Sequence, residues 1–120
     1  MPLQLDTGKE NLRMFFKDWQ VEALRYLWAV YPEGANSRKV WENVNSRLQG
    51  SISRASIINY LNAMVDDDLL TYTETTGKGG HHRVYYTKHG ESKFKQQIAG
   101  LVITKLLEEY PRETRKALQT

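Results

Sequence analysis

Apolar residues recur at α-helical spacing in three successive segments between about residues 18 and 68. Positions three, four or seven residues apart lie on the same side of a helix, so each segment predicts a helix with one buried face. We expect Asp18, then Asn36 or Ser37, and then Ser53 to cap the beginnings of these helices. The predicted buried faces are Val21, Leu24, Leu27 and Trp28 in the first helix, Val40, Trp41, Val44 and Leu48 in the second, and Ile57, Leu61, Met64 and Val65 in the third.

The three predicted helices end at Tyr31–Gly34, at Gln49–Gly50 and at Asp66–Asp68. Proline and glycine interrupt helices for steric and entropic reasons, which explains the first two ends. The acidic run is unexpected, because negative charge at a helix C-terminus opposes the helix dipole. A folding role is open only if Asp68 takes the left-handed position that glycine usually fills.

The period of the pattern changes after residue 69 from helical to alternating. Residues 70–75 and 82–87 are rich in threonine, tyrosine and valine, and the turn between them at residues 76–80 contains three glycines. This pattern predicts a β-hairpin. A long helix follows from about Gly90 to Tyr110, where Pro111 ends it, and the charged residues 112–120 either extend that helix or fray.

The order of three helices, a hairpin and a last helix predicts a mainly α protein with a small β-hairpin, an α+β fold. It is the order of a winged helix-turn-helix with an extra C-terminal dimerisation helix. We expect an N-terminal arm over residues 1–17, a winged-helix domain over 18–88 and a dimerisation helix over 89–120. Leu12, Met14, Phe15 and Phe16 are too apolar to be left in water, so the arm packs on a neighbouring element or on a partner subunit.

The composition is that of a soluble globular domain of 120 residues with a net charge of +3 and no cysteine. Without cysteine the chain forms no disulfide and no thiolate metal site. No apolar run is long enough to span a membrane and no secretory leader is visible, so a cytoplasmic location is expected. Basic residues outnumber acids in two stretches, residues 36–62 and 77–95. If the fold brings these stretches together, they form an anion-binding surface.

The third predicted helix has an unusual outward face. A face that serves only solubility is rich in Glu and Lys, whereas this one has small hydrogen-bonding side chains, one arginine, one isoleucine and no acid. Asparagine pairs with adenine, arginine with guanine, and an apolar side chain meets the methyl group of thymine. The residues predicted to read DNA are Ser53, Arg54, Ala55, Ser56, Ile58, Asn59 and Asn62.

Two other segments are predicted to contact the DNA backbone. The second helix begins with a serine and two basic residues, where free backbone N–H groups already favour a phosphate. The hairpin tip, or wing, has basic side chains around its glycines, which suits contact with the backbone or the minor groove. The residues concerned are Ser37, Arg38, Lys39, Lys78, His81, His82 and Arg83.

Residues 53–70, SRASIINYLNAMVDDDLL, resemble the recognition helix of the penicillinase and methicillin-resistance repressors. The resemblance extends in order and spacing over about residues 18–110, although MarR-like and PadR-like regulators share most of the pattern. It implies a DNA-binding homodimer joined through C-terminal helices, with Ala55, Ser56, Ile58 and Asn59 facing the groove. Ile58 stands where that family has arginine, and Asp66–Asp67 where it has two lysines, so the operator and the effector do not transfer.

The apolar band of the last helix is wider than a monomer of this size should expose, which predicts a homodimer. The residues assigned to dimerisation are Phe94, Ile98, Leu101, Val102 and Leu106. The sequence therefore predicts a transcriptional repressor that binds a pseudo-palindromic duplex, with no catalytic residues, no metal site and no cofactor. Two alternatives stay open. One is a winged-helix module for protein–protein assembly in transcription, and the other is a regulator that senses a small ligand of unknown identity.

Overall fold

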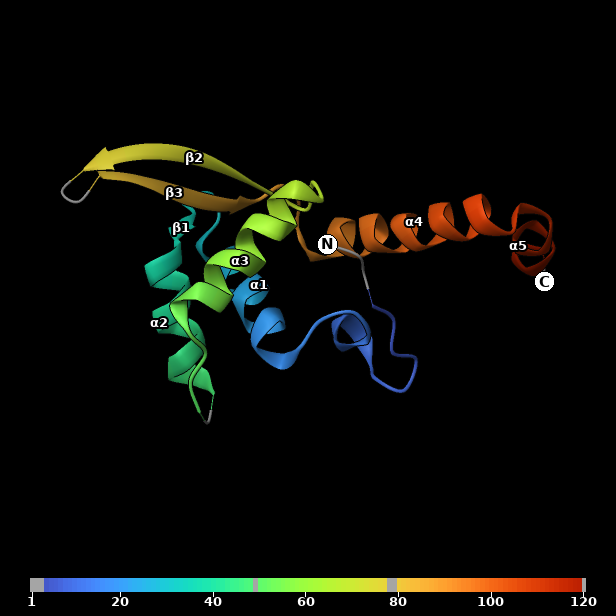
Figure 1. Ribbon diagram of the computed structural model, residues 1–120, viewed down its shortest axis with the longest axis horizontal. Coiled ribbons are helices and arrows are strands. Elements are labelled where there is room, and N and C mark those ends of the chain that lie inside the picture. The colour runs from blue at the N-terminus through green and yellow to red at the C-terminus, as the bar shows by residue number, and fades with distance from the viewer. Residues whose placement is uncertain (1–3, 49, 78–79, 120) are drawn as a thin grey trace.

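The computed structural model describes residues 4–48, 50–77 and 80–119, and Figure 1 shows their arrangement. The described residues form an elongated molecule with extents of 56 × 31 × 22 Å. The elements in chain order are the 3₁₀ helix η1 (Asn11–Met14), α1 (Asp18–Val30), β1 (Ala35–Asn36), α2 (Ser37–Arg47), α3 (Arg54–Asp66), β2 (Leu70–Gly77), β3 (Gly80–Thr87), α4 (Glu91–Glu109) and α5 (Pro111–Leu118).

The beginnings of α2 and α3 are capped as predicted. The Asn36 side chain accepts a hydrogen bond from the backbone N–H of Lys39 at 2.9 Å, and the Ser53 hydroxyl accepts one from the N–H of Ser56 at 3.1 Å. Each bond satisfies a backbone donor that has no partner within the helix. The prediction for α1 is wrong by one residue, because Asp18 is already helical and the N-cap is Lys17.

The acidic end of α3 adopts the left-handed backbone conformation that a folding role for Asp68 requires. Asp67 is the C-cap, and Asp68 follows with a φ of 62°, in the left-handed region. Aspartate tolerates this region better than most residues because its short polar side chain forms local hydrogen bonds. Asp68 thus reverses the chain where a glycine is more usual.

The hairpin forms a sheet with a third strand that was not predicted. β2 and β3 pair antiparallel from Leu70↔Thr87 to Gly77↔Gly80, and the two-residue β1 pairs with the other edge of β3. Two residues carry no alternation, so a sequence pattern does not reveal a strand this short. The predicted α+β fold, mainly helical with a small β-hairpin, is confirmed.

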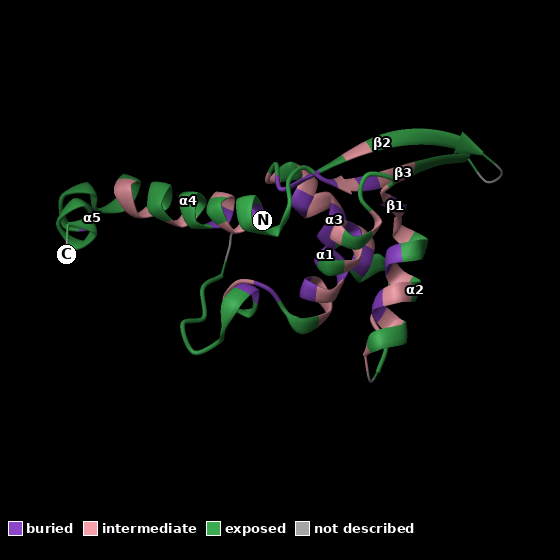
Figure 2. Ribbon diagram, turned by 180° about the vertical axis from the view of Figure 1, so that it is seen from behind, coloured by how far each residue is buried: buried purple, intermediate pink, exposed green. Residues whose placement is uncertain are grey.

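The core lies between α1, α2, α3, the sheet and the start of α4. Figure 2 shows the buried positions gathered in this body, whereas the far part of the hairpin and most of α4 and α5 are exposed. The N-terminal arm belongs to the core, because Leu12 is only 6% and Phe16 only 4% exposed. Phe16 packs edge-on against Tyr60 with ring centroids 6.2 Å apart and lies 6.1 Å from Phe94.

Burial raises the pKa of Tyr60, whose hydroxyl donates to the carbonyl of Gln20 at 3.2 Å.

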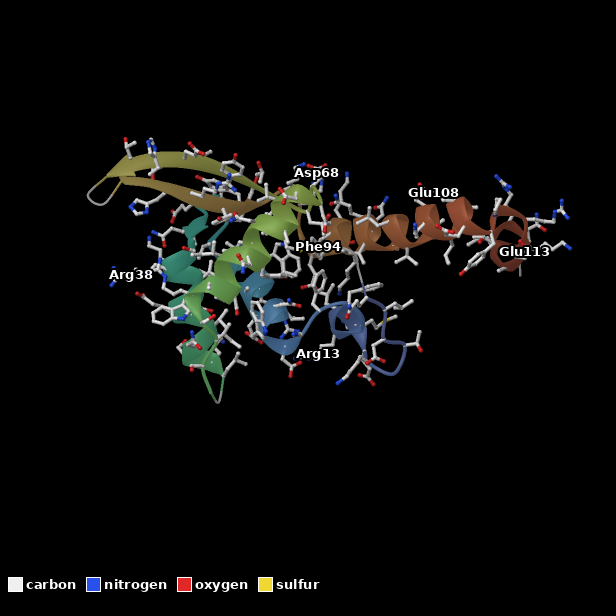
Figure 3. The ribbon with its side chains drawn as sticks, in the orientation of Figure 1. Arg13, Arg38, Asp68, Phe94, Glu108 and Glu113 are labelled. Atoms are coloured by element: carbon white, nitrogen blue, oxygen red, sulfur yellow. The ribbon has the colours of Figure 1, made fainter. Side chains whose placement is uncertain are left out.

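Phe94 and Ile98, expected at a dimer interface, are buried in the chain's own core. Each is 2% exposed, and the Phe94 ring packs on Trp28 at 5.4 Å (Figure 3). The last helix therefore has two parts. Its first two turns pack against the body, and the rest of α4 projects away from it (Figure 1). The periodicity of the sequence marks an apolar face but not which partner covers it.

Residues 112–118 neither extend α4 nor fray. α5 begins at Pro111. Proline fits the first helical turn because a backbone N–H at this position would have no partner within the helix, so its absence costs nothing. Thr114 is buried and donates its hydroxyl to the carbonyls of Tyr110 and Leu106, at 2.8 and 3.1 Å. These bonds fasten the corner between the two helices. Among the described residues, no helix has the length and apolarity needed to cross a membrane.

Phe94→Ala should lower the free energy of unfolding by about 3–5 kcal/mol, because it leaves a cavity under Trp28 and Phe16. Urea denaturation followed by tryptophan fluorescence measures this loss. Lys93→Ala, at an exposed neighbouring position, should change stability by less than about 0.5 kcal/mol and serves as the control. A loss below about 1 kcal/mol for Phe94→Ala would show that the ring is not a core residue.

Candidate nucleic-acid interface

Three elements lie in the part of the molecule away from α5: α2, whose start is beside the hairpin, α3, which begins at the other end of α2, and the hairpin itself (Figure 1). The strand β1 makes this arrangement, because Asn36 pairs with Val84 of β3 and also caps α2. The basic start of α2 is thereby held beside the wing. We call this the α3–wing surface; its described members are Ser37, Arg38 and Lys39 on α2, Ser53, Arg54, Ala55, Ser56, Ile58 and Asn59 at or on α3, and His81 and His82 on β3.

The helix α3 divides cleanly into a buried face and an open face. Ile57, Leu61 and Met64 are fully buried, with Tyr60 4% exposed beside them. On the other side the predicted readers between Ser53 and Asn59 are exposed, apart from Ile58, which is half-buried. Because Ala, Ser and Asn are small, the open face of α3 is able to approach another molecule closely.

The charge of the α3–wing surface is positive. No acid occurs between Arg54 and Val65. Arg38 is partly neutralised by Glu42, which it meets at 3.1 Å on the exposed side of α2. Lys39 and Arg54 are exposed, and neither is among the ion pairs of the described residues. Each of these two cations lies in the first turn of a helix, where the free N–H groups and the helix dipole favour an anion.

The loop before α3 is held by Asn45, a residue that the sequence did not single out. Its side-chain oxygen accepts from the N–H of Ile52 at 2.7 Å, and its amide nitrogen donates to the carbonyls of Ile52 at 3.2 Å and Trp41 at 3.0 Å. The indole N–H of Trp41 donates to the same Ile52 carbonyl at 2.8 Å. Ile52 directly precedes the cap of α3, so Asn45 fixes where that helix begins. An asparagine inside a helix is unfavourable, which is the only sequence signal for this role.

Asn62 and Arg83, both predicted to contact DNA, are hydrogen-bonded to one another. Arg83 Nη1 donates to Asn62 Oδ1 at 3.0 Å, and the hydroxyl of Tyr85 donates to the same oxygen at 2.6 Å. The Arg83 guanidinium carbon lies 4.0 Å from the centre of the Tyr72 ring. Burial raises the pKa of Tyr85, while Arg83 acts in the opposite direction, so the phenol stays a donor at neutral pH. Sequence spacing gives no sign that these residues meet.

Three of the residues predicted to contact the DNA backbone lie at or near the tip of the wing. Lys78 lies outside the described residues, whereas His81 and His82 are exposed on β3. Adjacent residues on a strand point to opposite faces, so these two imidazoles do not share a ligand. Among the described residues, no group of three or more His, Asp or Glu side chains is placed to hold a metal ion.

No family model matches the sequence, and neither does any curated protein sequence. The chain is similar in structure to ZitR of Lactococcus lactis, a zinc-responsive member of the MarR family. The TM-score is 0.50 at 13% identity, and the match covers 99% of this chain and 78% of that chain. At this identity the likeness shows the fold alone: the chain is a winged-helix protein, and α4 and α5 fall within the match.

Asn45→Ala should lower the free energy of unfolding by about 1–3 kcal/mol, since the N–H of Ile52 then loses its partner in a half-buried loop. Urea denaturation provides the measurement. Asn59→Ala is the matched control, an exposed asparagine without a hydrogen bond to the described residues, and should stay within about 0.5 kcal/mol. Equal losses in the two variants would contradict a special role for Asn45.

Proposed function

We propose that this protein is a sequence-specific double-stranded DNA-binding transcription regulator, a repressor that binds a pseudo-palindromic operator as a homodimer. The observation that supports it most is the open face of α3, which is free of acids, built of small polar side chains and flanked by cations. Such a face has no evident value for solubility, yet it fits the major groove. Repression follows from occupying a promoter, and the mechanism involves no bond-making step.

Each part of the α3–wing surface has a distinct proposed role. Asn59 is suited to pair with adenine and Arg54 with guanine, and Ile58 to meet a thymine methyl group. Ser37, Arg38 and Lys39 would hold a phosphate at the start of α2, where the N–H groups of the first turn point outward. His81, His82 and Lys78 would contact the backbone beside the groove. Phosphate contacts set the position of the protein, and base contacts set its sequence preference.

The homodimer is proposed from the free part of α4. Leu101 and Ile103 are 40% and 37% exposed, and Val102 and Leu106 are half-buried. An apolar groove of about 400 Å³ runs between α4 and the N-terminal arm, lined by side chains such as Leu5, Phe15 and Val102. A second copy would cover these surfaces, and two-fold symmetry would present two α3 helices to successive turns of one duplex.

The family, the effector, the alternative function and the cellular location are also proposed. The resemblance in residues 53–70 favours the penicillinase and methicillin-resistance repressors, whereas the structural likeness is to a MarR family member. The groove beside α4 is where a small apolar effector would bind if the protein senses a ligand. A protein-assembly module would instead use the acids of Asp66–Asp68. Stable capture of a protein partner, with no duplex enriched from a random pool, would favour that alternative. A cytoplasmic location is part of the same proposal.

Selection from a randomised duplex library should enrich one sequence with two inverted half-sites. Affinity for it should fall steeply with salt, because each neutralised phosphate releases counterions.

Lys39→Ala should weaken all duplexes alike and reduce the slope of log affinity against log salt by about one. Asn59→Ala should keep the slope and lose about 1–3 kcal/mol of discrimination at one base pair. A flat salt dependence of the unaltered protein would overturn the proposal.

Val102→Asp should convert a dimer into a monomer at micromolar concentration, because it places a charge in the proposed apolar contact. Sedimentation equilibrium measures the mass directly. Gln96→Asp, at an exposed position in the first part of α4, should leave the dimer intact and controls for added charge on this helix. A monomeric unaltered protein would contradict the proposed interface.

A further inference from the structure

The wing and the recognition helix are joined by a small cluster of side chains on one face of the hairpin. Tyr72 of β2 is opposite Tyr85 of β3, and Arg83 lies two residues from Tyr85, so the three side chains share a face. Asn62, in the middle of α3, receives hydrogen bonds from both Arg83 and Tyr85. We call these residues the Asn62–Arg83 link.

The link uses the polar groups that DNA contact would need. A carbonyl oxygen has two lone pairs, and Asn62 Oδ1 already accepts from two donors. Bidentate pairing with adenine requires this oxygen as an acceptor, so Asn62 is not free to read adenine in that way. The guanidinium of Arg83 is held between the Tyr72 ring and Asn62 and is half-buried. One of its five N–H donors is used by Asn62, and any movement of the side chain toward a phosphate would break both interactions.

We propose that Asn62 and Arg83 are positioning residues that fix the angle between the wing and α3, and that neither binds DNA in the complex. The inference rests on the proposed function, which it deepens by dividing the predicted contact residues into readers and supports. The planar guanidinium suits this task, since it donates along its edge and stacks with its face. The wing then docks in one register relative to the groove in which α3 lies.

The link has its own reason to persist without DNA. Tyr85 is 3% exposed, so its hydroxyl needs a partner within the protein, and Asn62 supplies it at 2.6 Å. β2 and β3 extend well beyond the body toward the wing tip (Figure 1), so a contact near their base controls the direction of the whole hairpin. Removal of either partner takes away one of the contacts that set that direction, the pairing of β3 with β1 being another.

The test compares Arg83→Met, Arg83→Lys and Asn62→Ala with Lys39→Met, a matched loss of charge at the start of α2. Binding to the selected duplex and to an unrelated duplex is measured over a range of salt. Arg83→Met should leave the salt slope unchanged and reduce discrimination about tenfold, and Arg83→Lys should do the same although its charge is kept. Lys39→Met should lower the slope by about one. Circular dichroism verifies that each variant is folded.

A double-mutant cycle separates positioning from contact. Asn62→Ala and Arg83→Met should be strongly non-additive in discrimination, because each breaks the same link, whereas Lys39→Met and Arg83→Met should add. Hydrogen exchange of the β2 and β3 amides in the free protein provides a readout without DNA. Each variant that breaks the link should exchange about tenfold faster near Tyr72 and Tyr85 than the unaltered protein.

The outcomes are distinguishable. A slope that falls by about one in Arg83→Met, or additive effects of Asn62→Ala and Arg83→Met, would overturn the inference and return Arg83 to the phosphate contacts. Unchanged exchange in both single variants would overturn it as well. If the unaltered protein selects no duplex but the variants still exchange faster near Tyr72 and Tyr85, the proposed function fails and the link itself is supported.

Discussion

The buried face of α3 packs Ile57, Leu61 and Met64 against α2 and the base of the hairpin with no exposed surface left on any of them. A close-packed contact of this kind permits one orientation of the helix, because a rotation of even a fraction of a turn would open a void or force side chains out of their rotamers. Every other feature of the α3–wing surface depends on that orientation. It decides which residues of α3 are left in solvent, and those are the small polar ones.

The asparagines around α3 illustrate how the same side chain serves different ends. Asn45 holds the preceding loop and Asn62 holds the wing, each through several hydrogen bonds within the protein. Asn59 is exposed and has no such partner among the described residues. A polar group that makes no internal bond contributes little to folding, so its presence on an acid-free face is better explained by an external partner. Composition alone does not separate these three residues.

The sequence predicted the helices α1 to α4, the hairpin and the open face of α3 because each depends on local pattern, and the caps at Asn36 and Ser53 were confirmed. It failed where the outcome depends on which surfaces meet. The strand β1 exists only because β3 passes beside it, and the burial of Phe94 depends on Phe16 and Trp28, which are distant in sequence. The pairing of Asn62 with Arg83 is of the same kind. Periodicity reports that a face is apolar or polar, but not what covers it.

The acidic end of α3 has a structural explanation once α4 is in view. Asp68 forms an ion pair with Lys88, and its carbonyl accepts a hydrogen bond from Gln97 of α4 at 2.8 Å. The indole of Trp28 donates to the carbonyl of His89 at 3.1 Å, in the same junction. The unfavourable interaction of these acids with the helix dipole is thus offset by contacts that join α3 to α4. The helix α3 is tied at its start to α2, at its middle to the wing and at its end to α4. In the proposed dimer, the direction of each α3 relative to the two-fold axis would therefore depend on the junction at Asp68.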